Sequence, residues 1–110
     1  MDVRTHLALC ESVARATDRM LQAARGADWD ALVTAEQACA LLVDRLRHDP
    51  VTASLDAEER ARKAALIRRM LANDREIRDI TRPELARLDR LLGPSRREAE
   101  LRRAYGPASG

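Results

Sequence analysis

The chain has 110 residues, the size of one domain, and a formal net charge of +2 from 20 basic and 18 acidic residues. Hydrophobic residues make up 45% of it, yet aromatic residues make up only 2% and phenylalanine is absent. Leucine and alanine therefore supply the apolar mass, which favours helix packing over sheets. Acidic and basic residues are interleaved, so no cluster of basic residues is available to bind phosphates. We therefore expect no nucleic-acid partner.

The cysteines and the start of the chain favour a cytoplasmic protein. Cys10 and Cys39 have neither the number nor the spacing of a disulfide framework, so we expect reduced thiols. Asp2 lies where a signal peptide carries basic residues, and no apolar run long enough for its hydrophobic region follows. No segment approaches the roughly 20 apolar residues of a spanning helix, so we expect no membrane contact.

Two antiparallel helices are predicted at about residues 3–25 and 28–47. The first has apolar or small residues every three or four positions: Val3, Leu7, Cys10, Ala14, Thr17, Leu21 and Ala24. We expect Gly26 to close it and Asp28 to cap the second helix. One seam of the second helix consists of Leu32, Ala35, Cys39, Leu42 and Leu46. The short turn between the helices makes them antiparallel neighbours.

A long third helix is predicted at about residues 57–92, with a capping signal formed by Asp56 and Glu59. Its stripe consists of Leu66, Met70, Asn73, Ile77, Thr81, Leu85, Leu88 and Leu92. The stripe keeps its phase across Pro83, which favours one kinked rod. The alternative is a break, because residues 81–84 also spell a capping box. In either case we expect the other helices to pack along one face of this segment.

A short fourth helix is predicted at about residues 95–105, because Gly93-Pro94 should end the rod and Ser95 can cap a new helix. It has few apolar anchors, so we expect it to be weakly held and detachable. The predicted fold is all-α: an antiparallel bundle of three main helices plus this short C-terminal helix, forming a single domain over residues 1–110.

No residues form a catalytic constellation, so we expect no enzyme activity, cofactor or metal. His6 and Cys10 are one helical turn apart, but two ligands do not close a zinc site. We interpret them as a boundary histidine beside a packed thiol. The four glycines lie at the ends of predicted elements, and none forms a phosphate-binding loop.

Three stretches in order resemble the flagellar export chaperone FliT family. Residues 26–32, Gly-Ala-Asp-Trp-Asp-Ala-Leu, resemble its junction between the first two helices. Residues 71–78, Leu-Ala-Asn-Asp-Arg-Glu-Ile-Arg, resemble a segment of its third helix, and residues 103–106, Arg-Ala-Tyr-Gly, resemble a motif near its end. Their order and spacing extend the resemblance over nearly the whole chain.

The resemblance implies a cytoplasmic type III export chaperone that binds and escorts the filament cap protein FliD. Some relatives also bind the export ATPase complex and inhibit the flagellar master transcription regulator. In the family the last helix can cover the partner-binding surface, so Leu101 and Tyr105 become candidate regulatory residues. Here the chain ends five residues after Tyr105, which leaves the strength of such autoinhibition open.

An apolar groove beside the third helix is the expected partner site, filled by the last helix at rest and by a client helix when loaded. The candidate groove residues are Ile67, Met70, Ile77, Arg78 and Ile80. For Met70 and Ile77, ordinary core packing is the competing interpretation. Apolar groove edges are also compatible with a homodimer.

Two alternatives to the chaperone remain open. One is a regulator that sequesters the flagellar master transcription factor by protein–protein contact, using the same groove. The other is a purely structural helical adaptor, which would have no displaceable helix.

Overall fold

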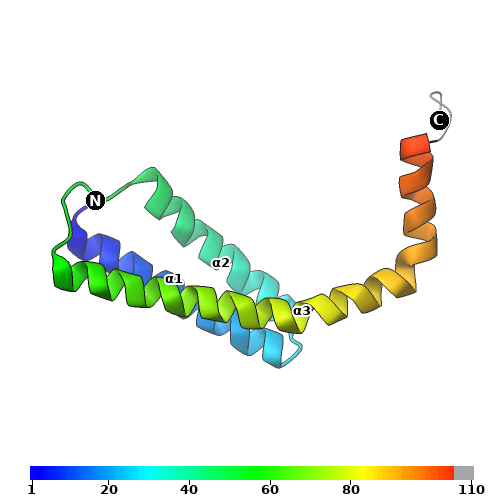
Figure 1. Ribbon diagram of the computed structural model, residues 1–110, viewed down its shortest axis with the longest axis horizontal. Coiled ribbons are helices and arrows are strands. Elements are labelled where there is room, and N and C mark those ends of the chain that lie inside the picture. Colours follow the sequence, from blue (N-terminus) through cyan, green and yellow to red (C-terminus); the bar gives the residue numbers. More distant parts are fainter. Residues whose placement is uncertain (106–110) are drawn as a thin grey trace. The chain divides into compact units, whose positions relative to one another are not determined.

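The computed structural model describes the backbone of residues 1–105 and the side chains of residues 1–92. Every element over that range is helical: α1 (Val3–Arg25), α2 (Trp29–His48) and α3 (Ala57–Tyr105) (Figure 1). Helix α1 packs against α2 and is joined to α3 by side-chain bonds such as that between Asn73 and Thr17. The predictions of an all-α fold and of three packed helices are confirmed.

Helix α3 is one helical element that passes through both Pro83 and Gly93-Pro94. Continuity at Pro83 confirms the single rod over the alternative of a break. The predicted stop at Gly93-Pro94 is wrong for the backbone, since a proline removes only one of the many hydrogen bonds of a 49-residue helix. The predicted separate helix at 95–105 and its packing lie outside the residues whose side chains are described.

The chain divides into two compact units, Met1–Arg78 and Asp79–Gly110. The boundary falls on Asp79, the residue whose carbonyl a proline at position 83 crowds. The first unit contains α1, α2 and the first half of α3. Whether residues 1–110 behave as a single folding domain stays a prediction.

Burial is centred on α1, not on the long helix that we expected to template the others. The buried residues of α1 are His6, Leu7, Leu9, Cys10, Val13, Ala14, Ala16, Leu21 and Ala24. Among the described residues of α3 only Ile77 is buried, and no residue of α2 is. The predicted seam of α2 is nevertheless its half-buried face, so the sequence identified the correct side of that helix. Helix α1 is the most enclosed because it has neighbours on two sides, α2 and α3.

The turn between α1 and α2 closes α1 with a pair of backbone bonds in which Asp28 N donates to Ala23 O and Ala27 N donates to Ala24 O. This is the Schellman arrangement, which requires a left-handed residue just after the helix. Ala27 has that conformation, with φ of 53°, while Gly26 has φ of −84°. The predicted end of α1 is therefore confirmed, but the residue that adopts the left-handed conformation there is Ala27 and not Gly26. Asp28 caps α2 as predicted, accepting from Ala31 N at 3.1 Å.

Helices α1 and α3 run parallel, and a ladder of three ion pairs fixes their register. Its members are Glu11–Arg62, Asp18–Arg69 and Arg25–Glu76. In each pair the two residues are 51 positions apart, and successive pairs are seven residues apart. Such heptad spacing keeps the pairs on one seam of two parallel helices. The ladder ends at Arg25, the last residue of α1.

The loop between α2 and α3 is tied to the start of α1. The Met1 ammonium group donates to Asp49 Oδ1 at 2.9 Å and to the Pro50 carbonyl at 2.7 Å. The Met1 carbonyl accepts from Thr52 N at 3.0 Å. At the other end of the loop Asp56 and Glu59 cap α3 reciprocally, at 2.8 and 2.9 Å, as predicted. These bonds fix the loop beside the first turns of α3.

Candidate partner-binding site

A hollow of about 550 Å³ lies where the α2–α3 loop meets α3. It is lined by Ser54, Leu55, Arg60, Lys63, Ala64 and Ile67, and we call it the cationic hollow. Three of its residues are apolar, two are basic and none is acidic. Arg60 donates to the Leu55 carbonyl at 2.7 Å, so one of the two bases also holds the loop wall in place.

Ile67 is the most accessible of the predicted apolar groove residues. Its side chain is 41% exposed and lines the cationic hollow. Met70 is half-buried one turn further along α3. A branched apolar side chain left this open on the wall of a hollow offers contact area to a partner.

The other predicted groove residues differ in accessibility. Ile77 is buried, with only 8% of its surface exposed, so the competing interpretation as core applies to it. Arg78 is exposed and forms an ion pair with Asp74 at 2.7 Å within α3. Ile80 is half-buried and belongs to the second compact unit. The side chains of Leu101 and Tyr105 lie outside the described residues.

The second unit carries an uncovered apolar stripe on α3. Leu85, Leu88, Leu91 and Leu92 are between 47% and 71% exposed. Three of them continue the sequence stripe that is inward-facing as far as Ile77. The ion-pair ladder to α1 ends at position 76, before the second unit begins at Asp79. Within the described part of the chain, exposed apolar surface of this kind makes the stripe a candidate interaction surface.

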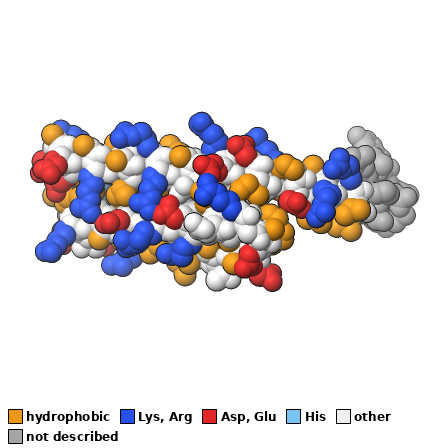
Figure 2. All heavy atoms as spheres, turned by 90° about the horizontal axis from the view of Figure 1, so that it is seen from below, with side chains coloured by type: hydrophobic (Ala, Val, Ile, Leu, Met, Phe, Trp, Pro, Cys, Tyr) orange, Lys and Arg blue, Asp and Glu red, His pale blue; other side chains and the backbone are white. Residues whose placement is uncertain are grey.

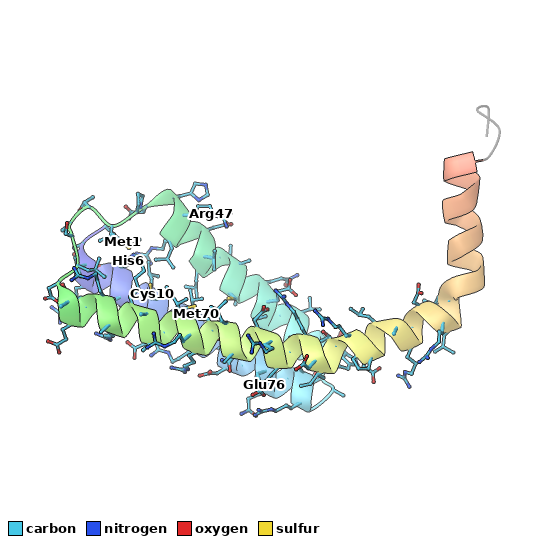
Figure 3. All side chains as sticks on the ribbon, in the orientation of Figure 1. Met1, His6, Cys10, Arg47, Met70 and Glu76 are labelled. Carbon is cyan, nitrogen blue, oxygen red and sulfur yellow. The ribbon has the colours of Figure 1, made fainter. Side chains whose placement is uncertain are left out.

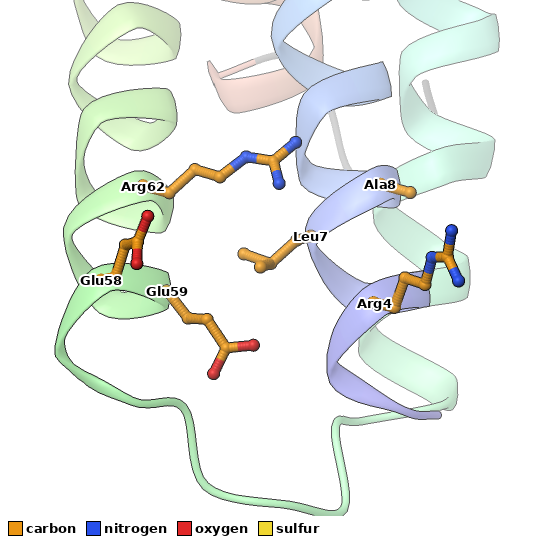
Figure 4. Close-up of a pocket in the computed structure, with 6 residues that line it drawn as sticks. All are labelled: Arg4, Leu7, Ala8, Glu58, Glu59 and Arg62. Carbon is orange, nitrogen blue, oxygen red and sulfur yellow. The ribbon is translucent and has the colours of Figure 1, made fainter.

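A second cleft, of about 380 Å³, lies between the first turns of α1 and α3 (Figure 4). Its charged residues are balanced: Arg4 and Arg62 lie with Glu58 and Glu59 around an apolar floor of Leu7 and Ala8. Arg62 is already engaged with Glu11 at 2.8 Å. On the face drawn in Figure 2, too, basic and acidic side chains are interspersed. A cleft that holds two basic and two acidic residues has no net charge with which to select a charged ligand.

His6 and Cys10 lie one turn apart on α1, with Cys10 Sγ 3.8 Å from His6 Nε2 (Figure 3). Burial lowers the pKa of His6, and the nearby Lys63 and Met1 charges lower it further. Burial also raises the pKa of the Cys10 thiol, which keeps it protonated and unreactive. Both shifts fit the interpretation as a packed thiol beside a histidine.

Two further features are absent from the described part of the chain. No group of three or more histidine, cysteine or acidic side chains there is arranged to hold a metal ion. No helix in that part is long and apolar enough to cross a membrane.

Sequence reasoning missed two features of this region. One is the ion-pair ladder, whose signal is the constant offset of 51 residues between opposite charges spaced by heptads. The other is Lys63, which lines the hollow beside Ile67. Lys63 could have been singled out in the sequence, because it is the only lysine among the twenty basic residues.

Comparison with known proteins agrees with the motifs noted in the sequence. The family model described as "Flagellar protein FliT" matches residues 7–107. The crystal structure of the flagellar protein FliT from Bordetella bronchiseptica superposes with a TM-score of 0.73 at 39% sequence identity, covering 79% of this chain and 98% of that one. Among curated proteins, none matches significantly. The family match spans most of the chain and the structural match agrees with it, so the chain belongs to the flagellar protein FliT family.

Proposed function

We propose that the protein is a cytoplasmic type III export chaperone that binds the C-terminal part of the filament cap protein FliD, keeps it unassembled and escorts it to the export machinery. The observation that carries the proposal is the accessible Ile67 on the wall of the cationic hollow, in a chain of the FliT family. A chaperone of this kind needs apolar surface that its client can reach. The exposed leucines of the second unit supply more of it.

In this proposal the client docks as an amphipathic helix along the exposed side of α3. Ile67 and Met70 contact its apolar face, and Arg78 lies at the rim. Ile77 supports this surface from the core, and Ile80, which belongs to the second unit, is a separate candidate contact. Leu101 and Tyr105 are the residues through which the last segment would compete with the client for the same surface.

The proposal is tested by calorimetric titration of the protein with the C-terminal segment of the cap protein from the same source. We expect a dissociation constant in the micromolar range or tighter, and at least tenfold weaker binding for Ile67→Asp, since one carboxylate is left facing apolar surface. Circular dichroism should show unchanged helicity, because Ile67 is exposed.

The matched control is Ala65→Asp, which places the same charge on an exposed position of the same helix turn, pointing away from Ile67. It should bind as the unmodified protein does. Equal weakening by both substitutions would show a general charge effect. Absence of binding by the unmodified protein would remove the assignment of the cap protein as client.

A further inference from the structure

Lys63 differs from the other basic residues on the inner side of α3. Arg62 and Arg69, on the same stretch, are each paired with a carboxylate of α1. Among the residues whose side chains the structure describes, none forms a hydrogen bond or ion pair with the Lys63 ammonium group. Its side chain is nevertheless half-buried, and its charge is felt at His6 and Cys10. An ammonium group that has no counter-ion and lies beside apolar surface gives a carboxylate of a partner a favourable place to bind.

The cationic hollow places this ammonium group beside apolar surface. Leu55, Ala64 and Ile67 line the same hollow as Lys63 and Arg60. Its volume of about 550 Å³ has room for several side chains of a partner. Its charge is of one sign, in contrast to the balanced cleft between α1 and α3. The combination of apolar walls and two bases matches a helix that carries apolar and acidic residues on one face.

The charge of the hollow also argues against the chain's own end as its occupant. Residues 93–110 contain four arginines and two glutamates, a net charge of +2. A basic segment would repel Lys63 and Arg60 instead of compensating them. The complementary occupant is therefore a foreign segment of opposite charge.

We infer that the cationic hollow is a recognition subsite for an acidic amphipathic helix of a partner protein, in which a carboxylate of the partner pairs with Lys63 while its apolar residues contact Leu55 and Ile67. The inference rests on the proposed function, since it names the chemistry of the client that the chaperone selects. Apolar contacts alone would accept many amphipathic helices, and the subsite adds a preference for acidic ones.

The test uses two synthetic fluorescein-labelled helices that share a leucine face and differ only in their charged residues, glutamate in one and lysine in the other. Fluorescence anisotropy should show the glutamate helix binding at least tenfold more tightly, the worth of about one charge-assisted hydrogen bond. Its affinity should fall as salt rises, because part of it is electrostatic. Lys63→Glu should remove the preference, and Arg60→Glu should weaken it.

Arg68→Glu is the matched control, because Arg68 is exposed on α3 and does not line the hollow. It should leave the preference for the glutamate helix intact. Should Lys63→Glu lose helicity, Lys63→Met and Arg60→Glu test the same point without burying a new charge. Equal binding of both helices, or an unchanged preference in the Lys63 and Arg60 variants, would overturn the inference.

Failure of the subsite and failure of the proposed function are distinguishable. The synthetic helices test the hollow without the cap protein, whereas the Ile67→Asp titration tests the client. If the glutamate helix bound only after removal of residues 95–110, the occupant of the hollow would be the chain's own segment, and the inference would be wrong.

Discussion

Ala27 is the residue in the first unit whose backbone conformation least suits its side chain. Its left-handed φ of 53° costs an alanine about 1 kcal/mol. The neighbouring Gly26 has φ of −84°, a conformation that any residue can adopt. We therefore expect Ala27→Gly to raise the free energy of unfolding by roughly 0.5–1 kcal/mol, the gain being reduced by the larger entropy of an unfolded glycine. Urea denaturation measures it.

The matched change is Gly26→Ala. A Cβ at position 26 would lie 3.5 Å from the Gln22 carbonyl oxygen, an ordinary contact, so this change should also stabilise, by about 0.5 kcal/mol. A loss of stability in Ala27→Gly would mean that the turn does not have this conformation in solution.

His6 gives the fold a pH dependence. Burial lowers its pKa in the folded state, so the unfolded chain, with a histidine pKa of about 6.5, takes up the proton first as pH falls. The contribution of neutral His6 to stability is complete above about pH 6.5 and is lost progressively as pH falls towards the folded-state pKa. Within the described residues its Nδ1 is buried without a partner, so a proton there gains no hydrogen bond.

Urea midpoints measured from pH 7.5 to 5 should therefore decline for the unmodified protein. In His6→Gln the decline should be shallower. His48→Gln, at the exposed end of α2, is the control and should keep the original slope. A His6→Gln profile parallel to that of the unmodified protein would show that other groups cause the decline.

At the scale of the elements, the ladder between α1 and α3 determines which residues face each other. Asp18 accepts hydrogen bonds from both Arg69 and Asn73, and the Arg69 bond is the largest cause of its lowered pKa. The ladder members are near half exposure, so solvent weakens them, and their role is register more than stability.

Asp18→Arg should lower the urea midpoint, since it places two guanidinium groups opposite each other. Arg69→Asp in the same chain should recover much of that loss by restoring opposite charges. Reversal of the Asp74–Arg78 pair, which lies within α3, is the control and should have a smaller effect. If the double variant were no more stable than Asp18→Arg alone, the two side chains would not be energetically coupled.

The elements show why some of the structure could be predicted and the rest could not. Helix period, capping residues and the seam of α2 are local properties, and the caps at Asp28 and Asp56 were correct. Which helix is most enclosed depends on how far its neighbours reach, and the long apolar stripe of α3 gave no sign that α1 ends opposite position 76. Ile67 could be placed at the stripe's edge from its phase, whereas the unpaired state of Lys63 depends on where α1 places its carboxylates.

At the scale of the whole molecule, the proposed function makes residues 95–110 a competitor of the client. Removing them should strengthen binding of the cap-protein segment severalfold, because apolar surface no longer has to be uncovered before the client docks. The measurement is the same titration with the chain ending before Ser95, and unchanged or weaker affinity would remove the autoinhibition.

The charge of that segment predicts where its competition should be absent. The segment has a net charge of +2, so it is repelled by the cationic hollow. Its apolar residues can still contact the apolar part of the surface. Truncation should therefore improve binding of the cap-protein segment, which needs the full surface, while leaving the synthetic glutamate helix within about twofold of its original affinity. Equal gains for both ligands would place the segment over the hollow itself and would contradict the inference that the hollow selects a foreign acidic helix.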